Sequence, residues 1–235
     1  MSVFLFAQSQ EWINFLYPAP IESLQSLLPV GLVPEIAEGM AWFSLMATEF
    51  REAKFKGLKL PFQNHFPGIS LRILVRKNNI PGYYFLRQIV AKHCIAQAAQ
   101  RIYKESYEAF PIEFSAPASS ISTENTYTTT LWRKSEQLEI RLQTEQGSYY
   151  QPIPGGLEAF LSLRNTGFSQ NEKGQLLSYT IEHQNKQWIT VNQSSISGNL
   201  GSVFKNCLPF EFPAQPALVQ VANGREIKLS TPRLL

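Results

Sequence analysis

The chain has 235 residues, of which 44% are hydrophobic, and this is enough for one β-rich domain with a sizeable core. Its net charge of +3 comes from scattered basic residues, which excludes the clustered cations of a nucleic-acid-binding surface. No apolar run reaches the roughly 18 residues of a membrane-spanning helix, and two cysteines are too few for a disulfide framework.

The N-terminal segment, residues 1–7, has no basic stretch and only a brief apolar run. A secretory signal peptide needs a positively charged start and a longer apolar region, so this segment does not fit one. We therefore predict a cytoplasmic protein that forms a single domain over residues 1–235.

Apolar and polar residues alternate through most of the chain, and this period of two predicts β-strands. In residues 69–76 every odd position is apolar, so Ser70, Arg72 and Leu74 share the other face. The same pattern occurs in residues 138–143, 177–182, 189–192, 219–222 and 227–230. Turn-forming residues separate the runs at 78–82, at 172–175 and at Asn223-Gly224, which is the clearest hairpin signal.

Helical patterns are few and short. Residues 21–28 have apolar residues at helical spacing between two prolines. Residues 90–104 form the longest pattern, with Val90, Cys94, Ala98 and Ile102 on one stripe. Residues 157–164 predict a third helix. Because strands outnumber helices, we predict a mainly β (α+β) fold, with an antiparallel sheet curled into a barrel or sandwich and helices outside it.

Well-known catalytic motifs do not occur in the sequence. It contains no phosphate-binding glycine loop, no dinucleotide fingerprint and no Gly-x-Ser-x-Gly element. His65, His93 and His183 lie far apart and follow no ligand spacing, so we predict no metal and no cofactor. His93 and Cys94 are adjacent, but neighbours on a helix point about 100° apart and do not share a proton easily.

Arg72 stands out because it interrupts a strongly apolar strand. Inside a closed barrel, one strand face lines the interior, and a guanidinium there needs an anionic partner. That partner is either a protein carboxylate or the carboxylate of a ligand bound through two hydrogen bonds. The alternative is an arginine on the solvent face.

Aromatic residues flank several predicted strand ends, and they either line an apolar ligand pocket or simply form core. They are Trp12, Trp42, Tyr83, Tyr84, Tyr107 and Trp132.

Several stretches, read in order, resemble the YqjF-like family of uncharacterised bacterial proteins, within the acetoacetate-decarboxylase-like superfamily. They are the strand 12–17, the leucine-rich segment 21–32 with its Leu-Pro-x-Gly-Leu ending, the strand 39–44, the strand 66–72 and the helix 156–164. Two positions depart from the family pattern, with Ser70 in place of asparagine and Asn165 in place of tyrosine. The resemblance spans most of the chain from Trp12 onward.

The resemblance implies an acetoacetate-decarboxylase-like antiparallel β barrel, with a central cavity and a few peripheral helices. Acetoacetate decarboxylases use a lysine of lowered pKa, next to a second lysine, to form a Schiff base. In the matching register this chain has Tyr107 and Glu108 where that pair is expected, while Lys92 and Lys104 fall on the predicted helix. We therefore do not predict the Schiff-base mechanism.

We predict a barrel protein that binds a small apolar or carboxylate-bearing molecule, and homo-oligomerisation stays open. The predicted ligand-binding residues are Arg72, Tyr84, Tyr107, Glu113 and Arg164, and catalytic residues stay unassigned. One alternative is an enzyme acting on a keto acid, with Lys92 or Lys104 as the amine, or Tyr107 and Glu113 as acid and base. The other is a structural domain whose cavity is packed core.

Overall fold

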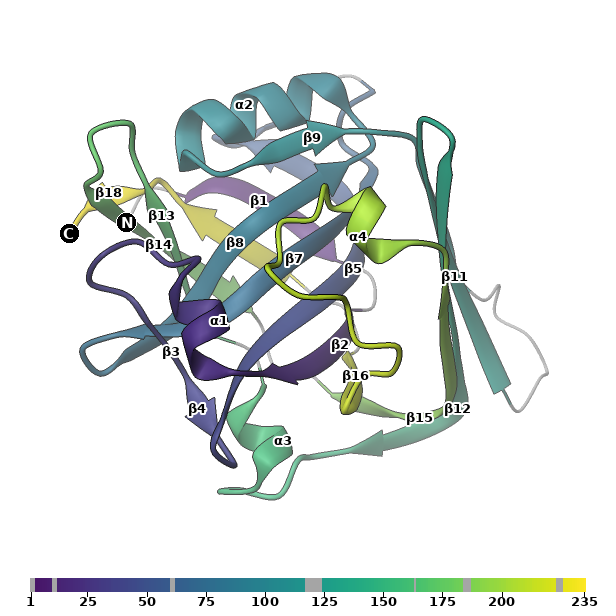
Figure 1. Cartoon of the computed structure of the whole chain (residues 1–235). Helices are drawn as coiled ribbons and strands as arrows, with labels where there is room; N and C mark the ends of the chain where they lie inside the picture. Colours follow the sequence, from purple (N-terminus) through teal and green to yellow (C-terminus); the bar gives the residue numbers. More distant parts are fainter. Residues whose placement is uncertain are drawn as a thin grey trace.

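The computed structural model describes residues 3–9, 12–59, 62–116, 124–162, 164–183, 187–222 and 226–235. Strands dominate, and the helices lie at the edges of the strand assembly (Figure 1). The strands are β1 (Val3–Ser9), β2 (Trp12–Ala19), β3 (Val33–Pro34), β4 (Ile36–Ala37), β5 (Met40–Phe55), β6 (Leu58–Lys59), β7 (Phe66–Lys77), β8 (Ile80–Val90), β9 (Tyr107–Ala109), β10 (Ile112–Ser115), β11 (Glu124–Arg133), β12 (Glu136–Tyr150), β13 (Thr166–Gln170), β14 (Leu176–His183), β15 (Trp188–Ser197), β16 (Leu218–Ala222), β17 (Glu226–Ser230) and β18 (Arg233–Leu234). The helices are α1 (Ile21–Gln25), α2 (His93–Tyr103), α3 (Leu157–Phe160) and α4 (Leu200–Val203).

Seven strands close a ring, which we refer to as the seven-stranded ring. Their order is β1, β5, β7, β8, β13, β14 and β17, and β17 pairs back to β1. Neighbours are antiparallel except β8 and β13, which run parallel where Gly167 faces Tyr83. Helix α2 packs against this ring, and its buried residues Ile95, Ala96 and Tyr103 belong to the ring's apolar core.

A second closed series of strands also includes β5, β7 and β8, and lies on the other face of these strands. It runs from β2 through β5, β7, β8 and β9, and then through β10, β11, β12, β15 and β16 back to β2. Strands β9 and β10 are joined by the chain itself, through Phe110 and Pro111. We refer to this series as the second ring.

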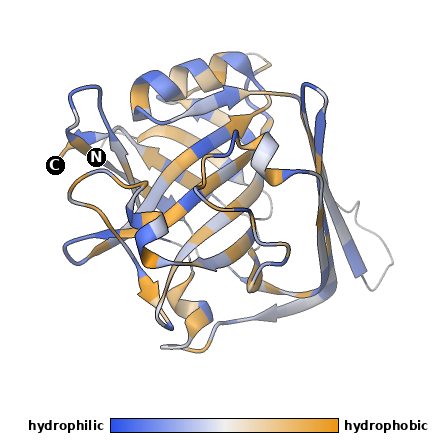
Figure 2. Ribbon diagram, in the orientation of Figure 1, coloured by the Kyte–Doolittle hydropathy of each residue, from blue (hydrophilic) through white to orange (hydrophobic). Residues whose placement is uncertain are grey.

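The two rings share β5, β7 and β8, and the central parts of β5 and β7 are buried on both faces. On β7 the odd residues, such as Leu71 and Ile73, lie in the core of the second ring. The even residues Ser70, Arg72 and Leu74 face the seven-stranded ring. Figure 2 shows hydrophobic residues along the strands in the middle of the molecule and hydrophilic ones at the outer turns.

A glycine fixes one contact inside the seven-stranded ring. Gly167 lies directly opposite Tyr179 on the neighbouring strand β14. A Cβ at residue 167 would lie 2.1 Å from Cζ of Tyr179, which is far closer than real side chains approach. Glycine therefore lets the Tyr179 ring lie across β13, and this places its phenol.

The mainly β fold with peripheral helices is confirmed. Helix α2 begins at His93 rather than at residue 90, because β8 continues to Val90. Cys94, predicted on its apolar stripe, is exposed, and the buried face centres on Ile95 instead. Helix α3 is four residues long, shorter than predicted, and the turn at Asn223-Gly224 lies outside the described residues.

None of the helices in the described ranges is both long enough and apolar enough to cross a membrane.

Candidate functional site

A small cavity lies inside the seven-stranded ring, next to α2. Its volume is about 80 Å³, which is roughly the share of liquid that three water molecules occupy. Its wall is mostly apolar and aromatic, with a few polar side chains. The polar residues of the wall are Thr48, Ser70, Arg72, Gln88, Tyr103, Tyr107 and Tyr179.

Arg72 is the charged residue of this wall, and it is almost completely buried, with 1% of its surface exposed. Its Nε donates to Oγ of Ser44 at 3.0 Å, and its Nη2 donates to Oδ1 of Asn14 at 3.3 Å. The guanidinium carbon lies 3.7 Å from the centre of the Tyr83 ring, a close cation–π contact. The alternative of a solvent-facing arginine is therefore wrong.

No carboxylate within the described ranges lies at ion-pair distance from Arg72. Burial lowers the pKa of the Arg72 guanidinium from its ordinary value, and the positive charge of Arg164 lowers it further. The neutral acceptors Ser44 and Asn14 compensate only part of the cost of burying a charge. The site therefore carries an uncompensated positive charge.

Arg164 lies close by but has its own acidic partner. Its Nε and Nη2 lie 2.7 and 2.6 Å from Oε2 of Glu35, and both side chains are nearly buried. Its backbone N–H donates to the Tyr83 hydroxyl at 3.2 Å. Arg164 thus supports the tyrosine on which Arg72 stacks, and its charge is neutralised locally.

Glu105, which follows α2, forms a second buried polar group beside the cavity. The Tyr179 hydroxyl donates to its Oε1 at 2.7 Å, Gln88 Nε2 donates to its Oε2, and the Tyr107 hydroxyl also hydrogen-bonds to it. Burial raises the pKa of Glu105 to about 8, because these hydrogen bonds offset only part of the cost of removing a carboxylate from water. The carboxyl group is therefore mostly protonated at neutral pH.

Three tyrosines surround this carboxyl group. Burial raises the pKa of Tyr103, Tyr107 and Tyr179 above the ordinary value of a phenol, and the nearby Glu105 raises all three further. All three remain neutral at physiological pH. They supply hydroxyl groups, not charge, to the cavity wall.

The structure brings together two of the five residues predicted to bind a ligand, since Arg72 and Tyr107 both line the small cavity. Tyr84 is half-buried and packs against the core of the second ring. Glu113 is exposed on β10, and Arg164 is paired to Glu35. These three do not line the cavity.

Sequence reasoning missed several polar residues at this site, namely Ser70, Gln88, Tyr103, Glu105 and Tyr179. Strand alternation puts Ser70 on the same face as Arg72, which was the available signal for it. No signal pointed to Glu105, because its side chain is buried only by the tertiary fold, between the exposed residues Lys104 and Ser106.

The lysines considered as amines lie away from the cavity. Lys92 is the residue before α2, and Lys104, at its C-terminal end, is exposed and 3.4 Å from Glu172. No lysine in the described part of the chain lines the small cavity. The described residues also hold no group of three or more His, Cys, Asp or Glu suited to a metal ion.

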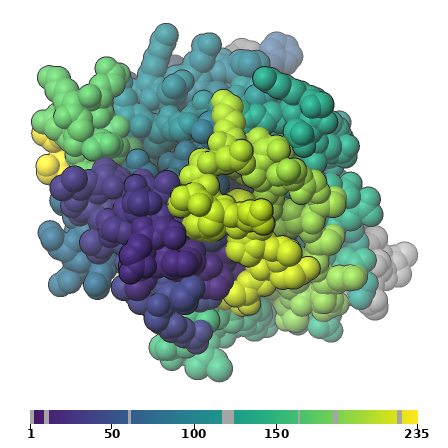
Figure 3. All heavy atoms as spheres, in the orientation of Figure 1, coloured from purple at the N-terminus to yellow at the C-terminus, as the bar shows by residue number. Residues whose placement is uncertain are grey.

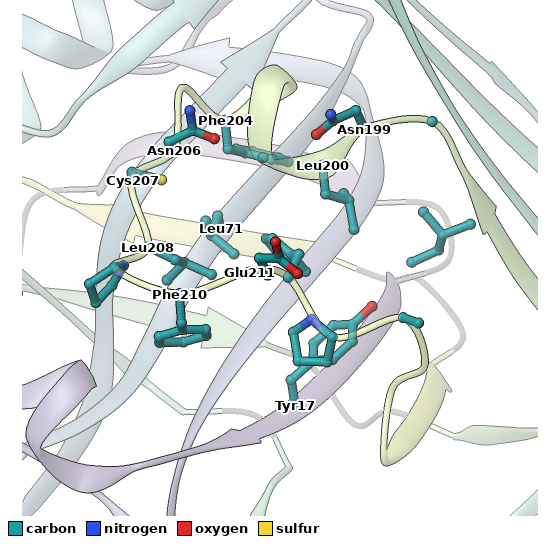
Figure 4. Close-up of a pocket in the computed structure, with 17 residues that line it drawn as sticks. Tyr17, Leu71, Asn199, Leu200, Phe204, Asn206, Cys207, Leu208, Phe210 and Glu211 are labelled. Atoms are coloured by element: carbon teal, nitrogen blue, oxygen red, sulfur yellow. The ribbon is translucent and has the colours of Figure 1, made fainter.

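A much larger cavity, of about 930 Å³, lies in the second ring and opens to solvent. The segment after α4 crosses over it, and Phe210 and Glu211 of this segment line the cavity together with Leu71 and Tyr17 (Figure 4). On the surface this segment covers the middle of one face (Figure 3). Leu71 and Arg72 are neighbours on β7, so the two cavities lie on opposite faces of the same strand.

Glu108 faces away from the small cavity, unlike its neighbour Tyr107. Its carboxylate is 2.8 Å from Arg87 Nη1 and 2.6 Å from Arg133 Nη2, and it also contacts Lys205. Burial raises the pKa of Glu108, but the hydrogen bond from Lys205 and the charges of the two arginines outweigh it, so the pKa is lowered. This cluster ties β8, β9 and β11 to the segment after α4.

The raised pKa of Glu105 predicts a pH-dependent stability. In the unfolded chain the carboxyl group has its ordinary pKa near 4.5, and in the folded protein the pKa is about 8. The stabilisation is therefore complete below pH 4.5 and is lost as the pH rises through 8. Between pH 4.5 and 8 we expect the free energy of unfolding of wild type to fall by on the order of 4 kcal/mol relative to that of Glu105→Gln, as measured by urea unfolding.

Glu182→Gln, at an exposed position of β14, is the control and should keep the pH dependence of wild type. Parallel pH curves for wild type and Glu105→Gln would show that Glu105 is ionised in the folded protein.

Solved structures with the same fold share little sequence with this chain. An acetoacetate decarboxylase-like enzyme from Sphingomonas wittichii RW1 superimposes with a TM-score of 0.68 at 13% identity, over 100% of this chain and 94% of that one. The enduracididine biosynthesis enzyme MppR, complexed with pyruvate, gives 0.70 at 12% identity, over 100% and 91%. Acetoacetate decarboxylase from Legionella pneumophila gives 0.64 at 11% identity, over 99% and 87%.

These superpositions establish the acetoacetate-decarboxylase-like fold, and at such low identity they say nothing about activity. No curated protein sequence matches the chain. A family model described as "Uncharacterized conserved protein (COG2071)" matches residues 9–226. The protein therefore belongs to the DUF2071 family, the YqjF-like family that its motifs resemble.

Proposed function

We propose that the seven-stranded ring binds a small carboxylate, held by Arg72, without forming a covalent Schiff base. The observation that carries the proposal is a buried guanidinium that faces a cavity and has no acidic partner in the described ranges. Burying an unpaired charge is costly, and a ligand carboxylate would restore the missing partner with charge-assisted hydrogen bonds.

The size of the cavity limits the ligand to a few carbon atoms. Pockets for drug-sized molecules and large cofactors occupy about 300–1,000 Å³, whereas this cavity has about 80 Å³. The apolar wall, with residues such as Met46, Phe85 and Ile181, suits a short alkyl part. The related fold of MppR, which has been solved in complex with pyruvate, supports a ligand of this class.

The chemistry of the wall supports non-covalent binding. Tyr107, which the family resemblance aligns with the Schiff-base lysine, contributes a neutral phenol. A phenol cannot form an imine with a keto group. The nearby amines, Lys92 and Lys104, lie outside the cavity wall.

Replacing Arg72 tests the proposal directly. Arg72→Met keeps an unbranched, flexible side chain and removes its charge, and we expect it to weaken binding of small carboxylates by about tenfold to a hundredfold. Arg72→Lys should be intermediate, because it keeps the charge and loses the planar fork. Titrations of acetate, propionate and pyruvate, followed by calorimetry or ligand-observed NMR, measure the affinities.

Arg76→Met is the matched control, because Arg76 lies on the same strand but is exposed. It should bind like wild type. Equal affinities for wild type and Arg72→Met would assign Arg72 to the scaffold alone.

Borohydride trapping tests the absence of a Schiff base. A lysine amine that condenses with a keto acid loses water to form an imine, which borohydride reduces to a stable amine. We expect no mass increase when the protein is incubated with pyruvate and borohydride and analysed by intact mass spectrometry. A stable adduct on Lys92 or Lys104 would overturn the non-covalent proposal.

One observation favours the alternative of an enzyme acting on a keto acid, namely the pKa of Glu105 near 8 beside the cavity. Such a group exchanges protons readily near neutral pH. It could act through Tyr107 or Tyr179, which line the cavity and hydrogen-bond to it.

Proton exchange separates the two functions. The binding proposal expects the methyl protons of pyruvate in D₂O to exchange no faster with the protein than in buffer, as followed by NMR. Exchange that wild type accelerates and Glu105→Gln does not would favour the enzyme.

A further inference from the structure

Two hydroxyl groups at the small cavity have no hydrogen-bond partner in the described structure. They are Oγ of Ser70 and the hydroxyl oxygen of Tyr103. Both residues line the cavity, and only 3% of Ser70 and 2% of Tyr103 is exposed. A buried hydroxyl without a partner loses its bonds to water and gains none in return.

The other phenols of the wall are already engaged. Tyr107 and Tyr179 both hydrogen-bond to Glu105. The contrast between satisfied and unsatisfied hydroxyls within one small cavity indicates that Ser70 and Tyr103 are free to bind whatever fills it.

These hydroxyls lie close to the proposed carboxylate site. Ser70 is two residues before Arg72 on β7 and faces the same interior, so their Cα atoms lie about 7 Å apart. Tyr103 reaches the same cavity from the last turn of α2. The cavity has a volume of only about 80 Å³. A ligand whose carboxylate is held by Arg72 can therefore bring a second oxygen near the two hydroxyls only if that oxygen is bonded to the first or second carbon after the carboxylate.

We propose that Ser70 and Tyr103 form a second polar subsite that holds a hydroxyl or keto oxygen of the ligand. The seven-stranded ring would then select short hydroxy or oxo acids over plain alkanoic acids of the same size. This inference rests on the proposed binding of a carboxylate by Arg72. It adds two specificity-determining residues and narrows the ligand class.

Isosteric acid pairs test the subsite without any mutation. Lactate and isobutyrate differ by a hydroxyl for a methyl at C2, and 3-hydroxybutyrate and isovalerate differ in the same way at C3. We expect wild type to bind the oxygenated member of at least one pair tenfold or more tightly, because the alkanoate leaves both hydroxyls without partners. Pyruvate measures whether a keto oxygen serves as well.

Ser70→Ala and Tyr103→Phe each remove one hydroxyl with little change of shape. Each should reduce the preference within the pair several-fold while leaving the affinity for the alkanoate unchanged or higher. Ser169→Ala is the control, since Ser169 is also buried with an unsatisfied hydroxyl but does not line the cavity. It should keep the preference of wild type.

The outcomes separate the two proposals. If wild type binds both members of each pair with equal affinity, the second subsite is overturned, and ordered water is then the partner of the two hydroxyls. Carboxylate binding by Arg72 would still stand. If wild type binds none of the five acids, the proposed function fails and the subsite fails with it. A preference that survives both substitutions would assign the recognition to other residues.

Discussion

The burial of three strands on both faces is the constraint on which the rest of this structure depends. Strands β5, β7 and β8 belong to two rings at once, so the central parts of β5 and β7 are buried on both faces. A polar side chain in these central parts is forced into one interior or the other, whereas Arg76, near the end of β7, reaches solvent. Ser44, Ser70 and Arg72 are buried for this reason, and their hydrogen-bonding requirements must be met inside the protein or by a ligand.

Charge is distributed unevenly in the interior that results. Glu35 neutralises Arg164, while Glu105 holds a proton and so supplies no negative charge at neutral pH. Arg72 is left as the source of positive potential in an apolar enclosure, where electrostatic interactions are weakly screened. An anion that enters therefore meets one cation and several neutral donors, an arrangement suited to holding a carboxylate in a single orientation.

The sequence predicted the fold well because strand alternation and turn residues are local signals, and because several short motifs matched one family. Arg72 and Tyr107 could be singled out for similar reasons, one as a charge on an apolar strand and the other through its place in a motif. Strand alternation also placed Ser70 beside Arg72, but Tyr103, Glu105 and Tyr179 could not be found, since their roles depend on which strand faces close around one interior. That closure joins β17 to β1 and β8 to β13, pairings between segments far apart in the chain. Glu113, which was predicted to bind the ligand, lies on an exposed face of β10 and does not line the small cavity.

The position of the two cavities on opposite faces of β7 has a consequence for how this protein can vary. Because side chains alternate along a strand, Arg72 faces the small cavity while its neighbour Leu71 faces the larger one. A substitution at position 70 or 72 therefore changes the wall of the small cavity and leaves the wall of the larger cavity unchanged. Deleting a single residue before Ser70 would turn the Arg72 side chain into the apolar core of the second ring and the Leu71 side chain toward the small cavity. A change in the length of β7 would therefore alter the walls of both cavities at once, whereas a replacement at position 70 or 72 alters the wall of the small cavity alone.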